Sequence, residues 1–391
     1  MDRWRSRVGR RAPAVALVLA AAAALSVGVV LGRSRLVPPP PARTPALSAL
    51  ATNPDLDPGT ALGGRPAPGF HLVNQFGHPA SLPQWRGRVV VLAFVDDRCT
   101  TICPLTTMSL LDAVHLLGPA ASGVQLVGVV ANPEALSVSD AASFSAAHGL
   151  TTAWQFLTGS LSQMRRVWSA YGIYAAIVDG QVDHTPAVYI INRQGREETL
   201  FETQMAYASI AQQSQILARA IARWLPGAPK VPARLSYRYV GGTAPTTPAA
   251  LPTATPTGGG PLVVLGPGQP HLVMFFASWL TQTTPLAEEL SALNTYAAVA
   301  GAHGWPALTA VDEAPTEPGP TSLATLLRHL RAPLSYPVAV DATGRLADGY
   351  GVQGLPWFVL TSRSGRVLWH HSGFLPLAQL EARVARYAPG A

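Results

Sequence analysis

Cysteine and lysine are nearly absent from this sequence, whose 391 residues include two cysteines and a single lysine, Lys230. Charged side chains make up only 13% of the chain, yet the formal net charge is +7. That charge is confined to one end, because residues 1–43 carry eight arginines and one aspartate, whereas the other 348 residues carry 20 basic and 20 acidic side chains. A neutral remainder lacks the basic surface that binds phosphate, so we exclude a nucleic-acid partner.

The two cysteines, Cys99 and Cys103, are separated by only three residues. In a chain exported from the cytosol they could simply form a structural disulfide. A loop this small removes little entropy from the unfolded chain, so a disulfide across it contributes little stability. The spacing therefore favours redox or metal chemistry.

The N-terminus combines arginines with an uncharged apolar run, Ala12 to Gly32. About 20 apolar residues suffice to span a bilayer, and arginines in front of such a run keep the N-terminus in the cytoplasm. A cleaved signal peptide is the alternative, but its apolar core usually has only about 7–15 residues. We predict a basic N-terminus and single-pass transmembrane anchor over 1–32, with the following domains outside the cytoplasm at the cell membrane. Residues 33–65 are rich in proline and predict an extended linker.

The segment around the cysteines predicts a strand, a turn and a helix. Val89 to Val95 is apolar throughout and rich in β-branched residues, which is typical of a strand buried on both faces. Pro104 suits the first turn of a helix, and apolar residues recur at helical spacing after it. Cys103 would then lie at the helix start, and Arg98 would lie beside Cys99. A helix N-terminus and a nearby cation both favour the thiolate, which binds metals and attacks disulfides.

Strand and helix patterns alternate along residues 66–225, which predicts an α/β domain with a central sheet flanked by helices. Residues 226–260 are rich in proline, threonine and glycine, with too little apolar content to fold alone, so we predict a second linker. Residues 261–391 repeat the plan of the first domain, which indicates an internal duplication of architecture.

Three segments of the first domain, in order, resemble the Sco (SenC) family of thioredoxin-fold proteins. They are "FVDDRCTTICP", similar to the family's C-x3-C-P motif after a buried strand, "WQFLTGS", and "VDHTPAVYIINRQG", similar to its V-D-H segment. The resemblance implies a thioredoxin-like fold in which Cys99, Cys103 and His184 form one copper site. It also implies delivery of copper to the binuclear copper centre in the copper-bearing subunit of cytochrome c oxidase, or reduction of that centre's cysteines.

The donor set suits that cargo. Thiolates are soft ligands that select Cu(I), and an imidazole suits both copper oxidation states. Two sulfurs and one nitrogen leave the shell incomplete, so a partner's thiolate can enter. Asp183 adjoins His184, but neighbours on an extended segment point in opposite directions, so we give it little role. Asp96 and Asp97 are interpreted as part of a solvated loop.

The second domain resembles the membrane-anchored thioredoxin-like reductases of the TlpA type. "MFFASWLTQTTPLAEEL" is similar to their strand, Trp-Cys-x-x-Cys motif and helix, with Leu280 and Thr283 where the cysteines would be. "YGVQGLPWFVL" is similar to their proline segment, which implies that Pro356 is a cis-proline. Without thiols this domain cannot exchange disulfides. We expect it to be a docking or packing module; a redundant relic is the alternative.

Other functions remain open for the same cysteines. A thiol–disulfide oxidoreductase would reduce extracytoplasmic cysteines through Cys99 and Cys103, and a thiol reductase would reset the pair. A zinc site with two cysteines and one histidine is a third hypothesis, and a peroxidase is a fourth. His184 discriminates between the first two, because a copper site needs it and dithiol exchange does not.

Overall fold

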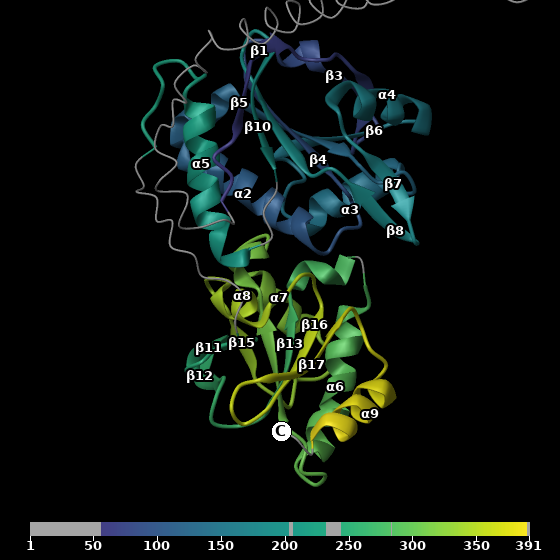
Figure 1. Ribbon diagram of the computed structural model, residues 1–391, viewed down its shortest axis with the longest axis vertical. Coiled ribbons are helices and arrows are strands. Elements are labelled where there is room, and N and C mark those ends of the chain that lie inside the picture. The colour runs from purple at the N-terminus through teal and green to yellow at the C-terminus, as the bar shows by residue number, and fades with distance from the viewer. Residues whose placement is uncertain (1–55, 203–205, 232–243, 283, 389–391) are drawn as a thin grey trace, which may run out of the picture. The chain divides into compact units, whose positions relative to one another are not determined.

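The computed structural model describes residues 56–202, 206–231, 244–282 and 284–388, whose order along the chain can be followed in Figure 1. The anchor predicted at 1–32 lies outside these residues. Within the described ranges, no helix has both the length and the apolar character needed to cross a membrane.

An eight-stranded sheet carries the cysteines, with the strand order β1-β10-β9-β4-β5-β6-β2-β3. Its strands are β1 (Thr60–Pro66), β2 (His71–Asn74), β3 (Pro79–Ser81), β4 (Val89–Val95), β5 (Val124–Val130), β6 (Trp154–Thr158), β9 (Ala187–Ile191) and β10 (Arg196–Glu202). Strand β4 runs parallel to β5 on one side and antiparallel to β9 on the other. Strands β7 (Ala175–Val178) and β8 (Gln181–His184) pair separately as a hairpin.

Helices and short 3-10 turns connect these strands. They are η1 (Leu82–Trp85), α2 (Ile102–Leu116), η2 (Gly118–Gly123), α3 (Val138–Ala147), α4 (Leu161–Tyr171), η3 (Tyr207–Ser209) and α5 (Ile210–Ala222). Helices α2 and α5 lie side by side (Figure 1). The predicted strand, turn and helix are confirmed, because every residue of β4 is buried and α2 begins at Ile102, one residue before Cys103.

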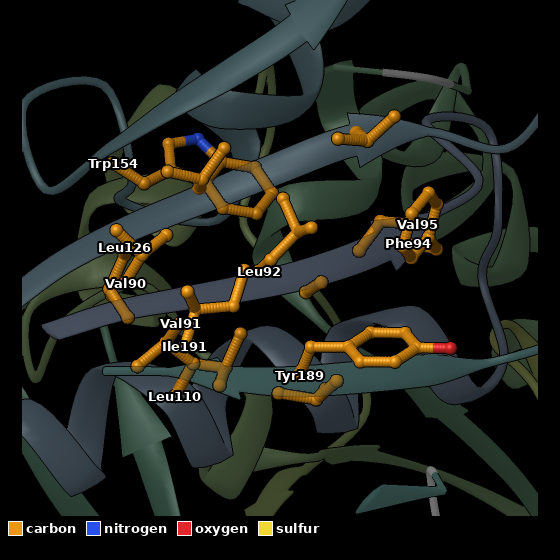
Figure 2. Packing of buried hydrophobic residues seen from close by; sticks show 14 of the residues in the cluster. Val90, Val91, Leu92, Phe94, Val95, Leu110, Leu126, Trp154, Tyr189 and Ile191 are labelled. Atoms are coloured by element: carbon orange, nitrogen blue, oxygen red, sulfur yellow. The ribbon is translucent and has the colours of Figure 1, made fainter. Parts of the chain in front are cut away.

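The core around β4 fixes the position of the cysteine loop. Figure 2 shows apolar side chains of β4 packed with Leu126, Trp154 and Ile191 from other strands of the sheet and with Leu110 of α2. Burying an aliphatic or aromatic side chain of this size stabilises a fold by about 1.5–3 kcal/mol. A strand with six such residues and Ala93, all of them buried, holds its carboxyl end, where the loop begins, in one place.

A seven-stranded sheet follows, with the strand order β12-β11-β15-β14-β13-β16-β17. Its strands are β11 (Ala249–Thr255), β12 (Gly258–Leu265), β13 (His271–Phe276), β14 (Ala307–Asp312), β15 (Val338–Val340), β16 (Trp357–Thr361) and β17 (Val367–Ser372). Its helical segments are η4 (Ser278–Gln282), α6 (Leu286–Ala300), η5 (Ala314–Thr316), α7 (Ser322–His329), α8 (Arg345–Tyr350) and α9 (Leu377–Tyr387).

The second sheet repeats the pairing of the first. Strand β13 runs parallel to β14 and antiparallel to β16, as β4 runs parallel to β5 and antiparallel to β9. The prediction of helix-flanked α/β sheets is therefore confirmed. Helices α6 and α9 lie side by side on this part of the chain (Figure 1).

Both predicted linkers contain strand residues and are shorter than expected. Strand β1 begins inside 33–65 and pairs with β10, and β11 lies inside 226–260, where it pairs with β12 and β15. Strand β1 is held by backbone hydrogen bonds to β10, which is distant in sequence, whereas β11 pairs mainly with its neighbour β12 and also meets the distant β15. Composition alone does not reveal such partners.

The core of the second sheet includes residues from the helices of the first region. All described residues belong to one compact unit. The core around β13 includes Leu105 and Met108 of α2, Ala147 of α3, Tyr207 of η3 and Ile210 of α5. The helix that begins at the cysteines therefore packs against both sheets.

Candidate thiol and metal centre

The cysteine loop joins the carboxyl end of β4 to α2. The Asp96 carboxylate holds it from two sides, because its Oδ1 accepts hydrogen bonds from the Arg98 amide at 2.9 Å and from the Asn132 side chain at 2.8 Å. Asn132 follows β5, so this contact joins the ends of two adjacent strands. Asp96 and Asp97 are only 7% and 3% exposed, so the interpretation of a solvated loop is wrong. The charges lie in the interior because the whole strand before them is buried.

Cys99 is half-buried and is the hydrogen-bond acceptor of the loop. Its Sγ lies 3.1 Å from the Thr101 hydroxyl, and it accepts from the amides of Thr101 at 3.4 Å and Cys103 at 3.5 Å. A hydrogen bond from the Cys103 thiol, together with these contacts to Thr101 and the Cys103 amide, lowers the pKa of Cys99 to about 7 despite its burial. Cys99 is therefore the thiolate of the pair.

Cys103 has the opposite environment. It is 2% exposed, and burial, followed by its hydrogen bond to Cys99, raises the pKa of its thiol well above the ordinary value. The expected effect of the helix N-terminus on a thiol is present, but it acts on Cys99, because the Cys103 amide in the first turn of α2 donates to the Cys99 sulfur. Arg98 was predicted to act on Cys99, whereas its guanidinium lies 3.4 Å from the Asp140 carboxylate.

His184 ends strand β8 and is half-buried. Burial lowers the pKa of its imidazole, although the charges of Asp96 and Asp183 oppose this effect. The ring is therefore neutral at pH 7, which is the form that binds metals. Its Nδ1 lies 3.2 Å from the Thr185 carbonyl oxygen, and the tautomer that donates this hydrogen bond presents Nε2 as the metal ligand.

The structure brings the two cysteines together but does not complete the expected three-ligand set. In the described part of the chain, no three histidine, cysteine, aspartate or glutamate side chains are close enough to hold a metal ion. His184 does lie within electrostatic range of Asp96 at the start of the cysteine loop. The donor types fit copper, since they are two soft sulfurs and a neutral imidazole. Asp183 is exposed where His184 is half-buried, as alternation along a strand requires.

Sequence reasoning missed the environment of Asp97. Both of its carboxylate oxygens are buried, and neither has a hydrogen-bond partner among the described residues. Burial, followed by the charges of Asp96 and Asp140, raises the pKa of Asp97 to about 8. The available signal was its position two residues after a fully apolar strand and two residues before Cys99.

The second sheet has a loop of related form without thiols. Leu280 in η4 is fully buried, and Thr283 lies outside the described residues. The Leu355–Pro356 peptide is cis, which confirms the expectation for Pro356.

Similarity to known proteins is found over the residues that form the first sheet and its helices. Residues 60–219 match the SCO1/SenC family model. The chain is 28% identical over 134 residues to the mitochondrial SCO2 homologue of Danio rerio, a match that covers 32% of this chain and 47% of that protein. It is 29% identical over 133 residues to the SCO1 homologue of Bacillus subtilis, covering 32% and 68%. The match thus spans about half the length of the first relative.

Matches to solved structures cover a somewhat larger share of this chain. ScoI of Bradyrhizobium japonicum, described with copper bound, is 21% identical, with 41% of this chain and 99% of that chain covered and a TM-score of 0.36. Apo Sco1 of Thermus thermophilus is 25% identical, with 42% and 95% covered and a TM-score of 0.36.

Proposed function

We propose, from the premise that residues 60–219 form an SCO1/SenC family thioredoxin-fold domain, that this protein binds copper and delivers it to cytochrome c oxidase. Members of that family take part in copper delivery and in cytochrome c oxidase assembly. The ligands we assign are Cys99, Cys103 and His184. The recipient is the copper-bearing subunit of the oxidase.

The observation that carries this proposal is the paired thiols at the end of β4. With a pKa of about 7, Cys99 is about half thiolate at neutral pH before any metal arrives. Cys103 keeps its proton until a metal replaces it, so copper binding releases at least one proton. His184 is neutral and needs no deprotonation. The ready thiolate makes first contact with Cu(I), and the buried sulfur and the imidazole complete the set.

The imidazole must approach the sulfurs to complete the site. It stands on the β7–β8 hairpin, which pairs outside the main sheet, so a shift of this hairpin breaks no strand pairing of the core. An open three-ligand shell leaves room for a partner's thiolate, through which the metal can be passed on.

A second function is favoured by the unequal acidity of the two thiols. In a thiol–disulfide oxidoreductase, the Cys99 thiolate attacks a substrate disulfide and releases one substrate thiolate, which takes up a proton. Cys103 then loses its proton and attacks the mixed disulfide, which releases the second substrate thiol and leaves a Cys99–Cys103 disulfide. A thiol reductase of unspecified identity must supply two electrons to reset the pair.

The test is copper binding by the reduced full chain, compared with His184→Ala and with His115→Ala as a matched control on the exposed side of α2. We expect one copper per chain with thiolate-to-copper charge-transfer bands in the wild type and in the control, and loss of stable copper in His184→Ala. Equal copper retention in His184→Ala contradicts the assigned site. A chain that holds no copper but exchanges readily with disulfides supports the oxidoreductase.

We further propose that residues 1–32 anchor the chain and that the cysteines lie outside the cytoplasm at the cell membrane. The uncharged run from Ala12 to Gly32 behind five arginines supports this location. Protease added to cells whose outer layers have been removed, but whose cell membrane is intact, should then digest the chain. Survival of the full chain under conditions that digest a known external protein would contradict this location.

A further inference from the structure

The loop between the two cysteines is in direct contact with the second α/β region. The backbone amide of Leu355 donates a hydrogen bond to the Thr100 carbonyl oxygen at 3.1 Å. Leu355 directly precedes the cis-proline Pro356 at the start of β16. A main-chain group of the region without cysteines therefore binds the main chain of the cysteine loop.

Gly354 packs against the same loop. A Cβ at this glycine would lie 2.8 Å from Thr101 Cγ2 and 3.5 Å from the Thr100 carbonyl oxygen, and its three nearest heavy atoms all belong to these two threonines. Thr101 also contacts the Cys99 sulfur through its hydroxyl and its amide. The contact thus reaches the residue that holds the thiolate.

Further contacts join the two α/β regions. The Asp348 carboxylate accepts hydrogen bonds from the amides of Tyr207 at 2.8 Å and Ala208 at 3.0 Å, with one oxygen for each. The Trp279 ring packs on His148, with a centroid distance of 4.6 Å. Because Met108 of α2 also lies in the core around β13, polar and apolar contacts act together.

We propose that residues 344–356, which we name the covering segment, bind the cysteine loop as a peptide ligand and restrict the access of partners to Cys99. Recognition uses the Leu355 amide and the surface over Gly354, so it needs no thiol. The second region therefore has a binding role that does not depend on a thiol, even though Leu280 occupies the position of a cysteine in the reductases that this region resembles. A partner polypeptide reaches Cys99 by displacing the covering segment from Thr100 and Thr101.

The covering segment leaves part of the cysteine loop exposed, so a partner that binds there can displace the segment. Cys99 is still half-buried and Thr101 is still exposed, so a small molecule can reach the sulfur while a folded partner meets the covering segment. The occupant is the covering segment of the chain itself, and the competing ligand is an extended segment of a partner protein, since both can donate a backbone amide to the Thr100 carbonyl oxygen. This inference concerns thiol access alone, so it goes beyond the proposed function and does not depend on copper.

The test uses Gly354→Val in the reduced full chain, with Gly301→Val as the matched control. The added side chain at 354 meets only the cysteine loop, whereas a side chain at 301 has no atom within 4 Å among the described residues. The alkylation rate of Cys99 is measured by mass spectrometry with iodoacetamide and with a maleimide bearing a large polyethylene glycol chain. Circular dichroism of each variant monitors folding.

We expect the bulky maleimide to react about tenfold faster with Gly354→Val, because overpacking shifts the population away from the covered state. Iodoacetamide should react at nearly the wild-type rate, and Gly301→Val should match the wild type with both reagents. Asp348→Asn, which weakens the contact to Tyr207 and Ala208, should give a smaller rise of the same kind.

Wild-type rates of maleimide labelling in both Gly354→Val and Asp348→Asn would overturn the inference. An equal rise with both reagents would also overturn it, because it would mean that the cysteine loop itself had loosened. Neither result bears on copper retention, so failure here is distinguishable from failure of the copper proposal, which is read from His184→Ala.

Discussion

At the scale of single residues, the chemistry of the loop depends on the difference between two neighbouring thiols. Cys99 accepts hydrogen bonds from the Cys103 thiol, from Thr101 and from the first turn of α2, whereas Cys103 is buried and donates. The same fold therefore makes one sulfur acidic and the other a proton donor. This arrangement serves metal binding and disulfide exchange alike, so His184 is the residue that separates them.

The reactivity of Cys99 should follow the titration of its thiol. Because its pKa is lowered to about 7, the rate of alkylation by iodoacetamide should rise between about pH 6 and 8 and level off above that range. Cys103→Ala should move this profile to higher pH, and Thr101→Val should move it less, since the Cys103 thiol lowers the pKa most. A profile unaffected by either change would contradict the assigned hydrogen bonds.

Asp97 should make stability fall as pH rises. Burial raises its pKa to about 8, so between pH 5 and 8 the folded chain holds a proton that the unfolded chain has lost, and each added pH unit lowers the free energy of unfolding. Asp97→Asn removes this dependence. The free energy of unfolding of Asp97→Asn minus that of the wild type should therefore be more positive at pH 8 than at pH 5, by roughly 2–4 kcal/mol. Urea unfolding at both pH values measures this difference.

The control for that measurement is Asp179→Asn, a change at an exposed turn. It should leave the difference in the free energy of unfolding between pH 5 and pH 8 the same as in the wild type. A wild-type pH dependence in Asp97→Asn would mean that the Asp97 carboxyl is solvated in the folded chain.

At the scale of elements, the ends of β4 and β5 act as one support for the cysteine loop. Asn132 follows β5, is 2% exposed, and donates to the Asp96 carboxylate, which in turn accepts the Arg98 amide. The loop is thus attached to the next strand before α2 begins. The β7–β8 hairpin forms a two-stranded sheet of its own, and it carries the third proposed ligand.

Asn132→Ala should loosen the loop without removing a proposed ligand. The Asp96 carboxylate loses a buried hydrogen-bond donor, which costs about 1–3 kcal/mol in the free energy of unfolding. Copper should also dissociate faster, because the two sulfurs are held less firmly. Denaturant unfolding and transfer of copper to a chelator measure the two effects. Wild-type values of both would show that the contact does not support the loop.

At the scale of the whole molecule, helix α2 contributes buried side chains to the cores of both sheets. Leu105 and Met108 of α2 lie in the core around β13, whereas Leu110 of the same helix lies in the core around β4. A helix that begins at the cysteines thus belongs to both cores. The described residues of both sheets belong to one compact unit.

Met108→Ala should weaken both sheets. Removing a buried methionine side chain costs about 2–5 kcal/mol. Because the helix contacts both cores, amide hydrogen exchange should become faster in β13 as well as in β4. Leu126→Ala, which lies only in the first core, is the control and should act mainly on β4. Unchanged exchange in β13 of Met108→Ala would mean that the two sheets unfold independently.

Much of the thiol site could be predicted from local sequence. The apolar run from Val89 to Val95 and Pro104 after the cysteines predict a strand, a loop and a helix start, because neighbouring residues fix these features. The repeat of this plan after residue 260 predicts the second sheet in the same way. The assignment of His184 as a third ligand stays a prediction, since the described side chains do not assemble a metal site.

The sequence by itself determined the thiol pair and its place between strand and helix. Only the tertiary structure decided which thiol is acidic, that the Asp97 carboxyl group is buried without a hydrogen-bond partner among the described residues, and that Leu355 binds the cysteine loop. The physical reason is distance along the chain. Burial and hydrogen bonding depend on neighbours that folding supplies from remote segments, here more than 250 residues away for Leu355 and Thr100.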